Sequence, residues 1–204
     1  MRPARGRTRA GARRAGLSLI EALIVLGLLA VAIGKVVMIL RAADRTNKVD
    51  SAAMAIEDQA RHVLDQVCYS IIGAARETLI PDPQSPTFDT ELTYRVSLGM
   101  EDGELVLGDV ERIGLGGSRS QLTWTQNPET KEEMRVVWCN VLRPYFAGEI
   151  PNGADDNDNG LIDETGLTFT LDRDAVTVRV MLERTNSDGT TVSKHVESTI
   201  TCRN

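Results

Sequence analysis

The run of residues 152–166, NGADDNDNGLIDETG, concentrates the carboxylate and amide side chains that metal ions bind. If Gly160 makes the sharp turn of a calcium loop, three alternate side chains fall at its first, third and fifth ligand positions: Asp155, Asn157 and Asn159. Calcium takes about six to eight oxygen ligands, and closely spaced Asp and Asn residues supply them. The sequence therefore predicts that calcium is a cofactor bound in this loop.

The remaining ligands of the expected shell lie just after the turn. Leu161 would give its backbone carbonyl, and Ile162 would anchor the loop on the core. An EF-hand has Glu at position twelve, where this chain has Gly166, so Asp163 or Glu164 would complete the shell. We expect a loop that resembles those of EF-hand or thrombospondin repeats, without the EF-hand helix pair. The alternative interpretation is a solvated acidic turn.

No other group of residues has the spacing of a catalytic or metal site. The histidines, His62 and His195, have no plausible ligand or nucleophile beside them, and no GxSxG or HExxH motif occurs. The cysteines, Cys68, Cys139 and Cys202, lack CxxC spacing, which argues against zinc and against a thioredoxin-like motif. They are either small buried residues or, in an oxidising compartment, one bridged pair and an odd thiol. We predict that the chain is not an enzyme.

Glu21 is an acid in an apolar segment, where burying a charge is costly. Residues 17–40, LSLIEALIVLGLLAVAIGKVVMIL, are nearly all apolar, and as a helix of about 36 Å they would cross a hydrocarbon layer of about 30 Å. Glu21 lies near the start of this run, and acids in such places are usually functional and paired. Cleavage after Gly16 would expose the α-amine of Leu17, which could neutralise Glu21 of a staggered neighbouring helix. The alternative is an interfacial Glu tolerated at the helix edge.

The first element that must position these residues is a helix. Beyond the apolar run, apolar residues recur at three- and four-residue spacing through positions 41–79, and no proline interrupts them before Pro81. We expect the membrane segment and this amphipathic continuation to form one helix of about 60 residues, roughly 90 Å long. The second half then has an apolar face that another element must cover.

The covering element is predicted to be β-structure within residues 80–204. Alternating apolar residues and intervening turn residues predict three hairpins: 92–98 with 105–107, 122–124 with 134–138, and 176–182 with 192–200. A helix followed by hairpins implies an α+β fold, in which the long N-terminal helix packs on an antiparallel β-sheet.

The first 16 residues form a basic leader. They hold six arginines and no acid, and the rest of the chain has 17 basic against 29 acidic residues, a balance of −12. Nucleic acid would repel so acidic a body, although the basic tract itself could be a nucleic-acid arm. Basic residues before the apolar run and an acidic body after it favour membrane targeting, with the N-terminus inside and the body outside.

These N-terminal residues resemble the processing site of type IV pilins and type II secretion pseudopilins. Residues 13–16, RRAG, followed by 17–21, LSLIE, present the basic leader, the Gly and the Glu at mature position five in the family's order. Members of the family usually begin Phe-Thr-Leu-Ile-Glu and often have a proline midway along the anchor. This chain begins Leu-Ser and has no proline there, so a kink in its anchor is not expected.

The resemblance implies how the chain is processed and what it does. A prepilin peptidase would cleave after Gly16, the new N-terminus at Leu17 would be N-methylated, and Glu21 would serve in assembly. The size of the body, the acidic loop before the last hairpin and the ending TCRN are similar to those of J-type minor pseudopilins. Such a subunit would span the bacterial inner membrane once, with its N-terminus cytoplasmic and its body periplasmic. It would join other pseudopilins in a periplasmic pseudopilus that supports protein export.

Three alternatives stay open. The chain could be a minor pilin of a type IV pilus or of a DNA-uptake filament. From another class, it could be a membrane-anchored, calcium-binding exported domain or enzyme. A conventional signal peptide, cut after the small-x-small residues Ala30-Val31-Ala32, would leave a mature chain that begins at Ile33, although Glu21 would interrupt its apolar region.

Overall fold

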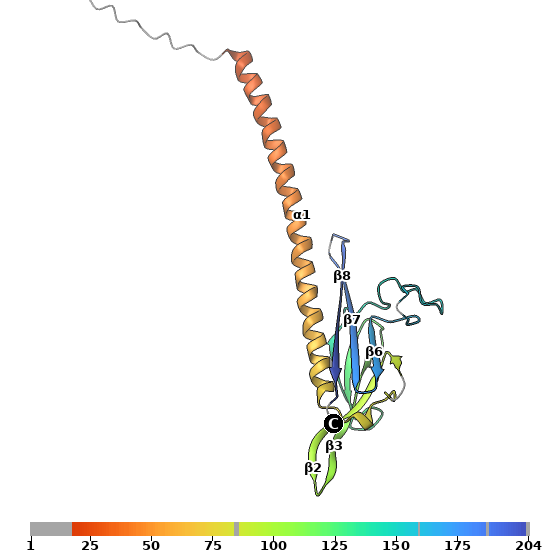
Figure 1. Ribbon diagram of the computed structural model, residues 1–204. Coiled ribbons are helices and arrows are strands. Elements are labelled where there is room, and N and C mark those ends of the chain that lie inside the picture. The colour runs from red at the N-terminus through yellow and green to blue at the C-terminus, as the bar shows by residue number, and fades with distance from the viewer. Residues whose placement is uncertain (1–17, 84–85, 159, 187, 203–204) are drawn as a thin grey trace, which may run out of the picture. The chain divides into compact units, whose positions relative to one another are not determined.

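The computed structural model describes residues 18–83, 86–158, 160–186 and 188–202 (Figure 1). The chain divides into two compact units, Met1–Asn47 and Lys48–Asn204, and helix α1, Leu19–Ile72, contributes residues to both. All buried core residues of the described chain belong to the second unit. Because that unit has a hydrophobic core of its own, we expect it to fold without the first.

The first unit is helical over its described residues. Every side chain from Ser18 to Lys48 is exposed, and large apolar side chains cover the helix from Leu19 to Leu40. Within the described residues, α1 is the one helix long and apolar enough to cross a membrane. A helix that is apolar all round requires lipid or other helices to cover it. This segment therefore has the character expected of a membrane anchor or a signal sequence.

In the second unit, α1 buries one stripe of side chains. The stripe has the three- and four-residue spacing predicted from the sequence, and its members are Ile56, Ala60, Val63, Leu64, Val67 and Ile71. The helix ends at Ile72, before the predicted end at Leu79, and Gly73 follows it. Ala74 and Ile80 then form β-bridges to strand β2, Leu92–Glu101. Pairing with this strand replaces the last helical turns.

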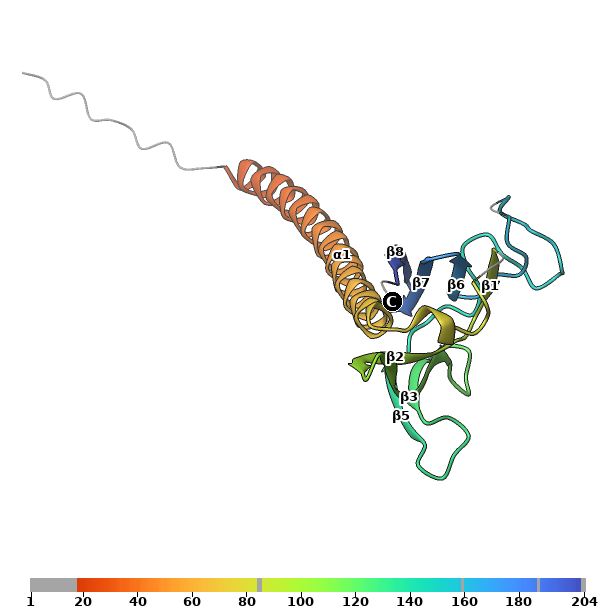
Figure 2. The ribbon, with the colours of Figure 1, turned by 60° about the horizontal axis from the view of Figure 1, so that its bottom comes forward.

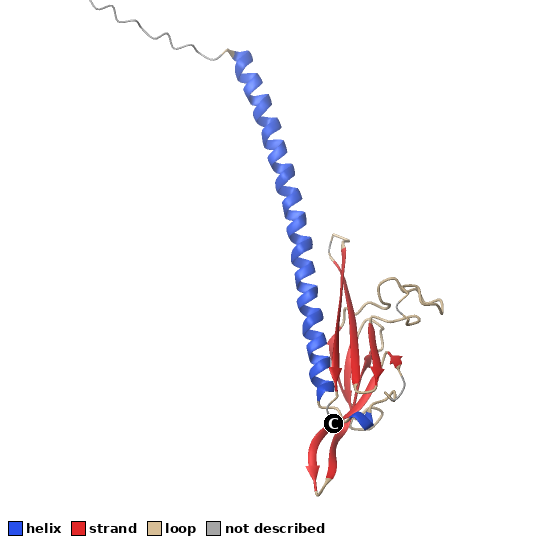
Figure 3. Ribbon diagram, in the orientation of Figure 1, coloured by secondary structure: helices blue, strands red, loops and turns tan. Residues whose placement is uncertain are grey.

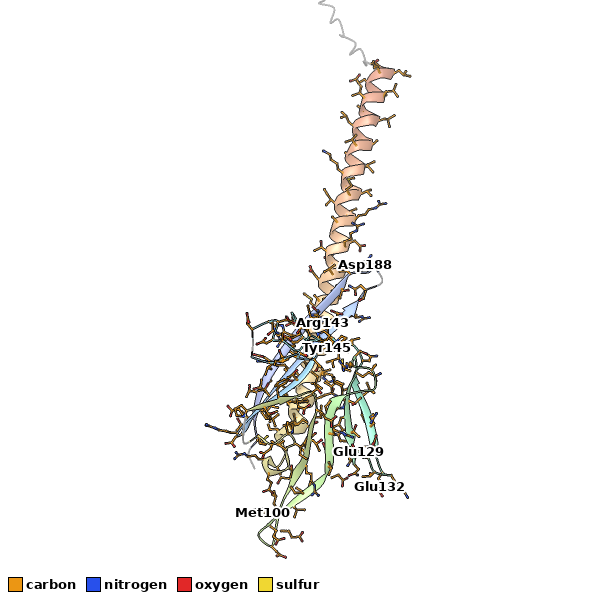
Figure 4. All side chains as sticks on the ribbon, turned by 90° about the vertical axis from the view of Figure 1, so that its right-hand side faces the viewer. Met100, Glu129, Glu132, Arg143, Tyr145 and Asp188 are labelled. Carbon is orange, nitrogen blue, oxygen red and sulfur yellow. The ribbon has the colours of Figure 1, made fainter. Side chains whose placement is uncertain are left out.

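One antiparallel sheet has the strand order β2-β3-β4-β5. It contains the first two predicted hairpins, which are confirmed, and its further strands are β3 Glu104–Leu115, β4 Leu122–Gln126 and β5 Met134–Cys139. The β2–β3 turn is Asp102-Gly103, with φ of 50° and 88°. Two consecutive positive φ angles match the twist of a two-residue hairpin, which explains the Asp-Gly pair. Met100 lies near this tip (Figure 4).

A second antiparallel sheet has the order β1-β6-β7-β8. Its strands are β1 Thr87–Asp89, β6 Leu167–Asp172, β7 Ala175–Thr185 and β8 Thr191–Thr201. The β7–β8 hairpin confirms the third prediction, whereas β1 and β6 were not predicted. Because β6 pairs with β7, the last hairpin joins a separate sheet, and the prediction of a single sheet is wrong.

The core lies where α1 meets the two sheets (Figures 2 and 3). It includes the helix stripe, Tyr94 and Ile113 of one sheet, and Phe169 and Val178 of the other. The α+β class is therefore confirmed, with one long N-terminal helix and two antiparallel sheets. The three cysteines are free thiols, and burial raises the pKa of each of them.

Candidate functional site

The predicted processing residues, Gly16 and Leu17, lie outside the described residues. Glu21 is in the first turn of α1 and is exposed. Its carboxylate takes part in no hydrogen bond or ion pair among the described residues. Its carboxylate therefore depends on a partner from elsewhere wherever water is excluded from the helix.

The acidic loop belongs to the second unit, and contacts between its two ends close it at its base. Tyr145 and Thr165 form a β-bridge, and the Phe146 amide donates a hydrogen bond of 2.9 Å to the Glu164 carbonyl. These contacts hold the two ends of the loop together just before β6. The loop precedes β6 in the ribbon (Figure 1), and Tyr145 at its base is labelled in Figure 4. The residues between them are mostly exposed, so the side chains of the loop rather than the core determine its conformation.

The start of the predicted calcium loop has the turn that its register requires. Oδ2 of Asp155 accepts a 2.7 Å hydrogen bond from the amide of Gly160, which joins the predicted first and sixth positions. Gly160 has φ of 88°, a conformation that favours glycine and that suits the sharp turn. Asn157 donates from Nδ2 to the Ala147 carbonyl at 3.4 Å, and Asn159 lies outside the described residues.

The carboxylate of Asp163 holds backbone amides at the start of the same run. Its Oδ1 accepts from the amides of Asn152 and Gly153 at 2.9 and 3.1 Å, and its Oδ2 accepts from Gly153 at 3.0 Å. Asp156, an intervening residue in the predicted register, accepts from Asn152 Nδ2 at 3.0 Å on both oxygens. In this conformation the Asp163 carboxylate ties the end of the loop to the backbone amides at its start.

Glu164 is placed differently from the other predicted ligands. Its side chain is fully buried, and its Oε1 lies 3.1 Å from Nη1 of Arg179 on β7. Arg179 also pairs with Glu197 of β8 through Nε, at 3.2 Å. The Arg179 guanidinium thus balances the charge of Glu164 within the body.

Glu149 is a buried acid that the sequence did not identify. It is 7% exposed, and neither carboxylate oxygen has a hydrogen-bond partner among the described residues. The chain on either side of it touches the loop: Ala147 accepts from Asn157, and the Ile150 amide donates to Asp156 Oδ2 at 3.2 Å. Burying an unpaired carboxylate is costly, and a bound cation would offset that cost. A single Glu before Ile-Pro has no spacing that would have predicted this role.

The oxygen donors of the loop fit calcium in part. Asp155 and Gly160 are joined as the calcium register requires, and the unpaired carboxylate of Glu149 adds negative charge to the segment that contacts the loop. Among the described residues, no three Asp, Glu, His or Cys side chains converge as a metal cluster. A calcium shell here would therefore draw on amide, carbonyl and water oxygens as well as on carboxylates.

No family model, curated protein or solved structure matches the chain.

Proposed function

We propose that the chain is a pilin-like structural subunit, a minor pseudopilin of a type II secretion pseudopilus, that assembles through its N-terminal helix. The observation that carries the proposal is Glu21, an exposed acid with no partner among the described residues, in a helix apolar enough to cross a membrane. A helix that served only as an anchor would have no use for this charge. A helix that docks against another in lipid can use it to select and orient its neighbour.

The leader residues RRAG before Leu17 support the same proposal. Prepilin peptidase cleaves after Gly16, and the freed amine of Leu17 is the positive group that pairs with Glu21 of an adjacent subunit. The apolar surface of α1 from Leu19 to Leu40 packs against lipid before assembly and against neighbouring helices after it. The second unit stays outside the inner membrane, in the periplasm.

The loop of residues 152–166 binds calcium in this proposal. The turn between Asp155 and Gly160 and the unpaired Glu149 support calcium, which would add positive charge to residues 144–172, a segment without Lys or Arg. These residues also keep one alternative open, an exported calcium-binding domain that uses α1 only as an anchor. The two functions differ in what they require of Glu21.

Replacing Glu21 tests the proposed function. Glu21→Val should leave membrane insertion and processing intact but impair assembly. The substitution removes the carboxylate that pairs with the Leu17 amine of the adjacent subunit. Removing one member of a buried ion pair costs about 3–5 kcal/mol, which is enough to disfavour the docked subunit. The measurement is cross-linking of the subunit to its filament neighbours in membranes, together with secretion of the exported protein.

Asp44→Val is the matched control. Asp44 is an acid on the same helix but lies beyond the apolar run, so its loss should leave assembly unchanged. A Glu21→Val strain that cross-links and secretes like the wild type would remove the assembly role and favour the anchored-domain alternative.

A further inference from the structure

The second unit has an apolar groove of about 460 Å³ between the end of α1 and the sheet β2-β3-β4-β5. It arises because α1 ends at Ile72, so that the helix leaves part of the sheet face uncovered. Exposed apolar side chains form its rim, with Tyr69 79%, Ile72 53% and Val136 40% exposed. An uncovered apolar surface of this kind marks an interaction site.

Two tryptophans on neighbouring strands form a wall of the groove. Trp124 of β4 and Trp138 of β5 stack with ring centroids 6.3 Å apart and planes inclined by 10°. Both side chains are only partly buried and both line the groove. Indole faces attract cations through the negative charge of their π-system.

A carboxylate lies beside these rings. Oε2 of Glu111, on β3, accepts hydrogen bonds of 2.8 Å from the Tyr94 hydroxyl and of 2.8 Å from Trp124 Nε1. Tyr94 is fully buried, and burial together with the negative charge of Glu111 raises its pKa. The two hydrogen bonds fix the carboxylate in position within the groove.

Glu111 has no ion-pair partner among the described residues. The three arginines on this sheet are engaged elsewhere. Arg112 pairs with Glu91 and Glu129, and Arg135 pairs with Glu133. Arg95 donates from Nε to the Gly108 carbonyl. A partly buried carboxylate beside two indole rings thus has no cation paired with it in the part of the chain that the structure describes. The groove offers negative charge and aromatic surface together, and their complement is a cationic group attached to apolar neighbours.

We propose that the groove between α1 and β2–β5 binds an arginine side chain that a protein partner presents within an apolar segment. A guanidinium is planar, stacks on an indole and donates to a carboxylate, so it satisfies Trp124, Trp138 and Glu111 at once. The exposed apolar rim takes the residues that flank the arginine. The acidic balance of the body, −12 without the leader, favours a basic partner over long range. The inference depends on the chemistry of the groove and does not require that the chain assemble into a filament.

Intrinsic fluorescence tests the proposal directly, because the chain contains only two tryptophans and both line the groove. The full-length protein in detergent is titrated with acetyl-Leu-Arg-Leu-amide and with the same peptide carrying citrulline, the neutral isostere of arginine. The arginine peptide should change the emission saturably and bind at least about tenfold more tightly than the citrulline peptide, since a hydrogen bond to a charged group contributes about 1.5–3 kcal/mol.

Glu111→Gln should abolish the preference for arginine. The amide oxygen of glutamine can still accept from Tyr94 and Trp124, so the groove keeps its shape, and an unchanged melting temperature verifies that the variant folds. Glu104→Gln is the matched control: Glu104 lies on the same strand but is exposed at the β2–β3 turn, and the preference should persist.

Three results would overturn the proposal. Equal affinities for the arginine and citrulline peptides would mean that Glu111 does not recognise charge. A preference that survives Glu111→Gln would place the cation elsewhere. Choline binding more tightly than the arginine peptide would reassign the groove to a small quaternary ammonium ligand. None of these results depends on Glu21 or on assembly, so the failure of this inference is distinguishable from the failure of the proposed function.

Discussion

At the level of single residues, the acids of the chain occupy three contrasting environments. Glu21 is exposed on an apolar helix, Glu164 is buried against Arg179, and Glu149 is buried with no hydrogen-bond partner among the described residues. The cost of each charge differs accordingly: water satisfies an exposed carboxylate, an ion pair compensates a buried one, and an unpaired buried carboxylate destabilises the fold. Of these three acids, Glu21 and Glu149 are therefore the two for which an external cation or amine would matter.

Calcium should stabilise the second unit, and this effect should depend on Asp155. A ligand that binds only the folded state at a hundred times its Kd adds about 2.7 kcal/mol, and magnesium should do less because it prefers a compact octahedron. Asp155→Ala should abolish the stabilisation. Asp158→Ala, at an intervening position of the predicted register, should keep most of it. The measurement is a set of melting curves for residues 48–204 and both variants, with calcium and with chelator.

Two outcomes would contradict this expectation. If chelator leaves the melting temperature of the wild type unchanged, the loop is only a solvated acidic turn. If Asp158→Ala loses as much as Asp155→Ala, calcium binds but the register with Gly160 at position six is wrong.

Only some of these residue environments could be predicted from the sequence. The turn that joins Asp155 to Gly160 could be predicted from their spacing, because hydrogen bonds in short loops form between residues close in sequence. The burial of Glu164 against Arg179 could not be foreseen, since it depends on which strand lies beside the loop. The same holds for Glu149, whose burial follows from the fold of the chain around it.

At the level of elements, an ion-pair network joins the second sheet across its strands. Arg179 of β7 links the buried Glu164, just before β6, to Glu197 of β8. Arg179 and Glu197 are directly paired in the antiparallel register. The network therefore lies across three consecutive segments of the sheet and holds the end of the acidic loop against it.

Replacing Arg179 should be strongly destabilising. Arg179→Met leaves Glu164 buried without its cation, and breaking a buried pair from one side costs about 3–5 kcal/mol. Arg173→Met is the control, because Arg173 is largely exposed and its nearest acid, Asp172, is 4.0 Å away, so its loss should change stability by less than about 0.5 kcal/mol. Urea unfolding of residues 48–204 gives both values. Equal, small effects of the two substitutions would show that Glu164 does not need Arg179.

Sequence patterns predicted the elements better than their arrangement. The three hairpins were found because alternation and turn residues such as Asp102-Gly103 act locally. Strand β6 was missed although Leu167, Phe169 and Leu171 alternate and are fully buried, and β1 was missed because it has only three residues. Because the sequence did not predict β6, it gave no reason to place the last hairpin in a separate sheet. The division into two sheets therefore could not be predicted, since it depends on which strands pair.

At the scale of the whole molecule, the chain combines an apolar N-terminal helix with an α+β body that has its own core. The body carries the two surfaces that we propose for recognition, the groove between α1 and β2–β5 and the acidic loop. The helix supplies the apolar surface and the single acid on which the proposed assembly depends. Both parts are needed for a filament subunit, whereas an exported domain would need the helix only as an anchor or a signal.

The mature N-terminus, determined by mass spectrometry of the membrane-bound protein, tests the filament proposal most directly. We expect a chain that begins at N-methylated Leu17, and we expect Gly16→Ala to block this processing. A mature chain that begins at Ile33 would identify a conventional signal peptide. A chain that still begins at Met1 in cells with an active prepilin peptidase would likewise contradict the proposed function.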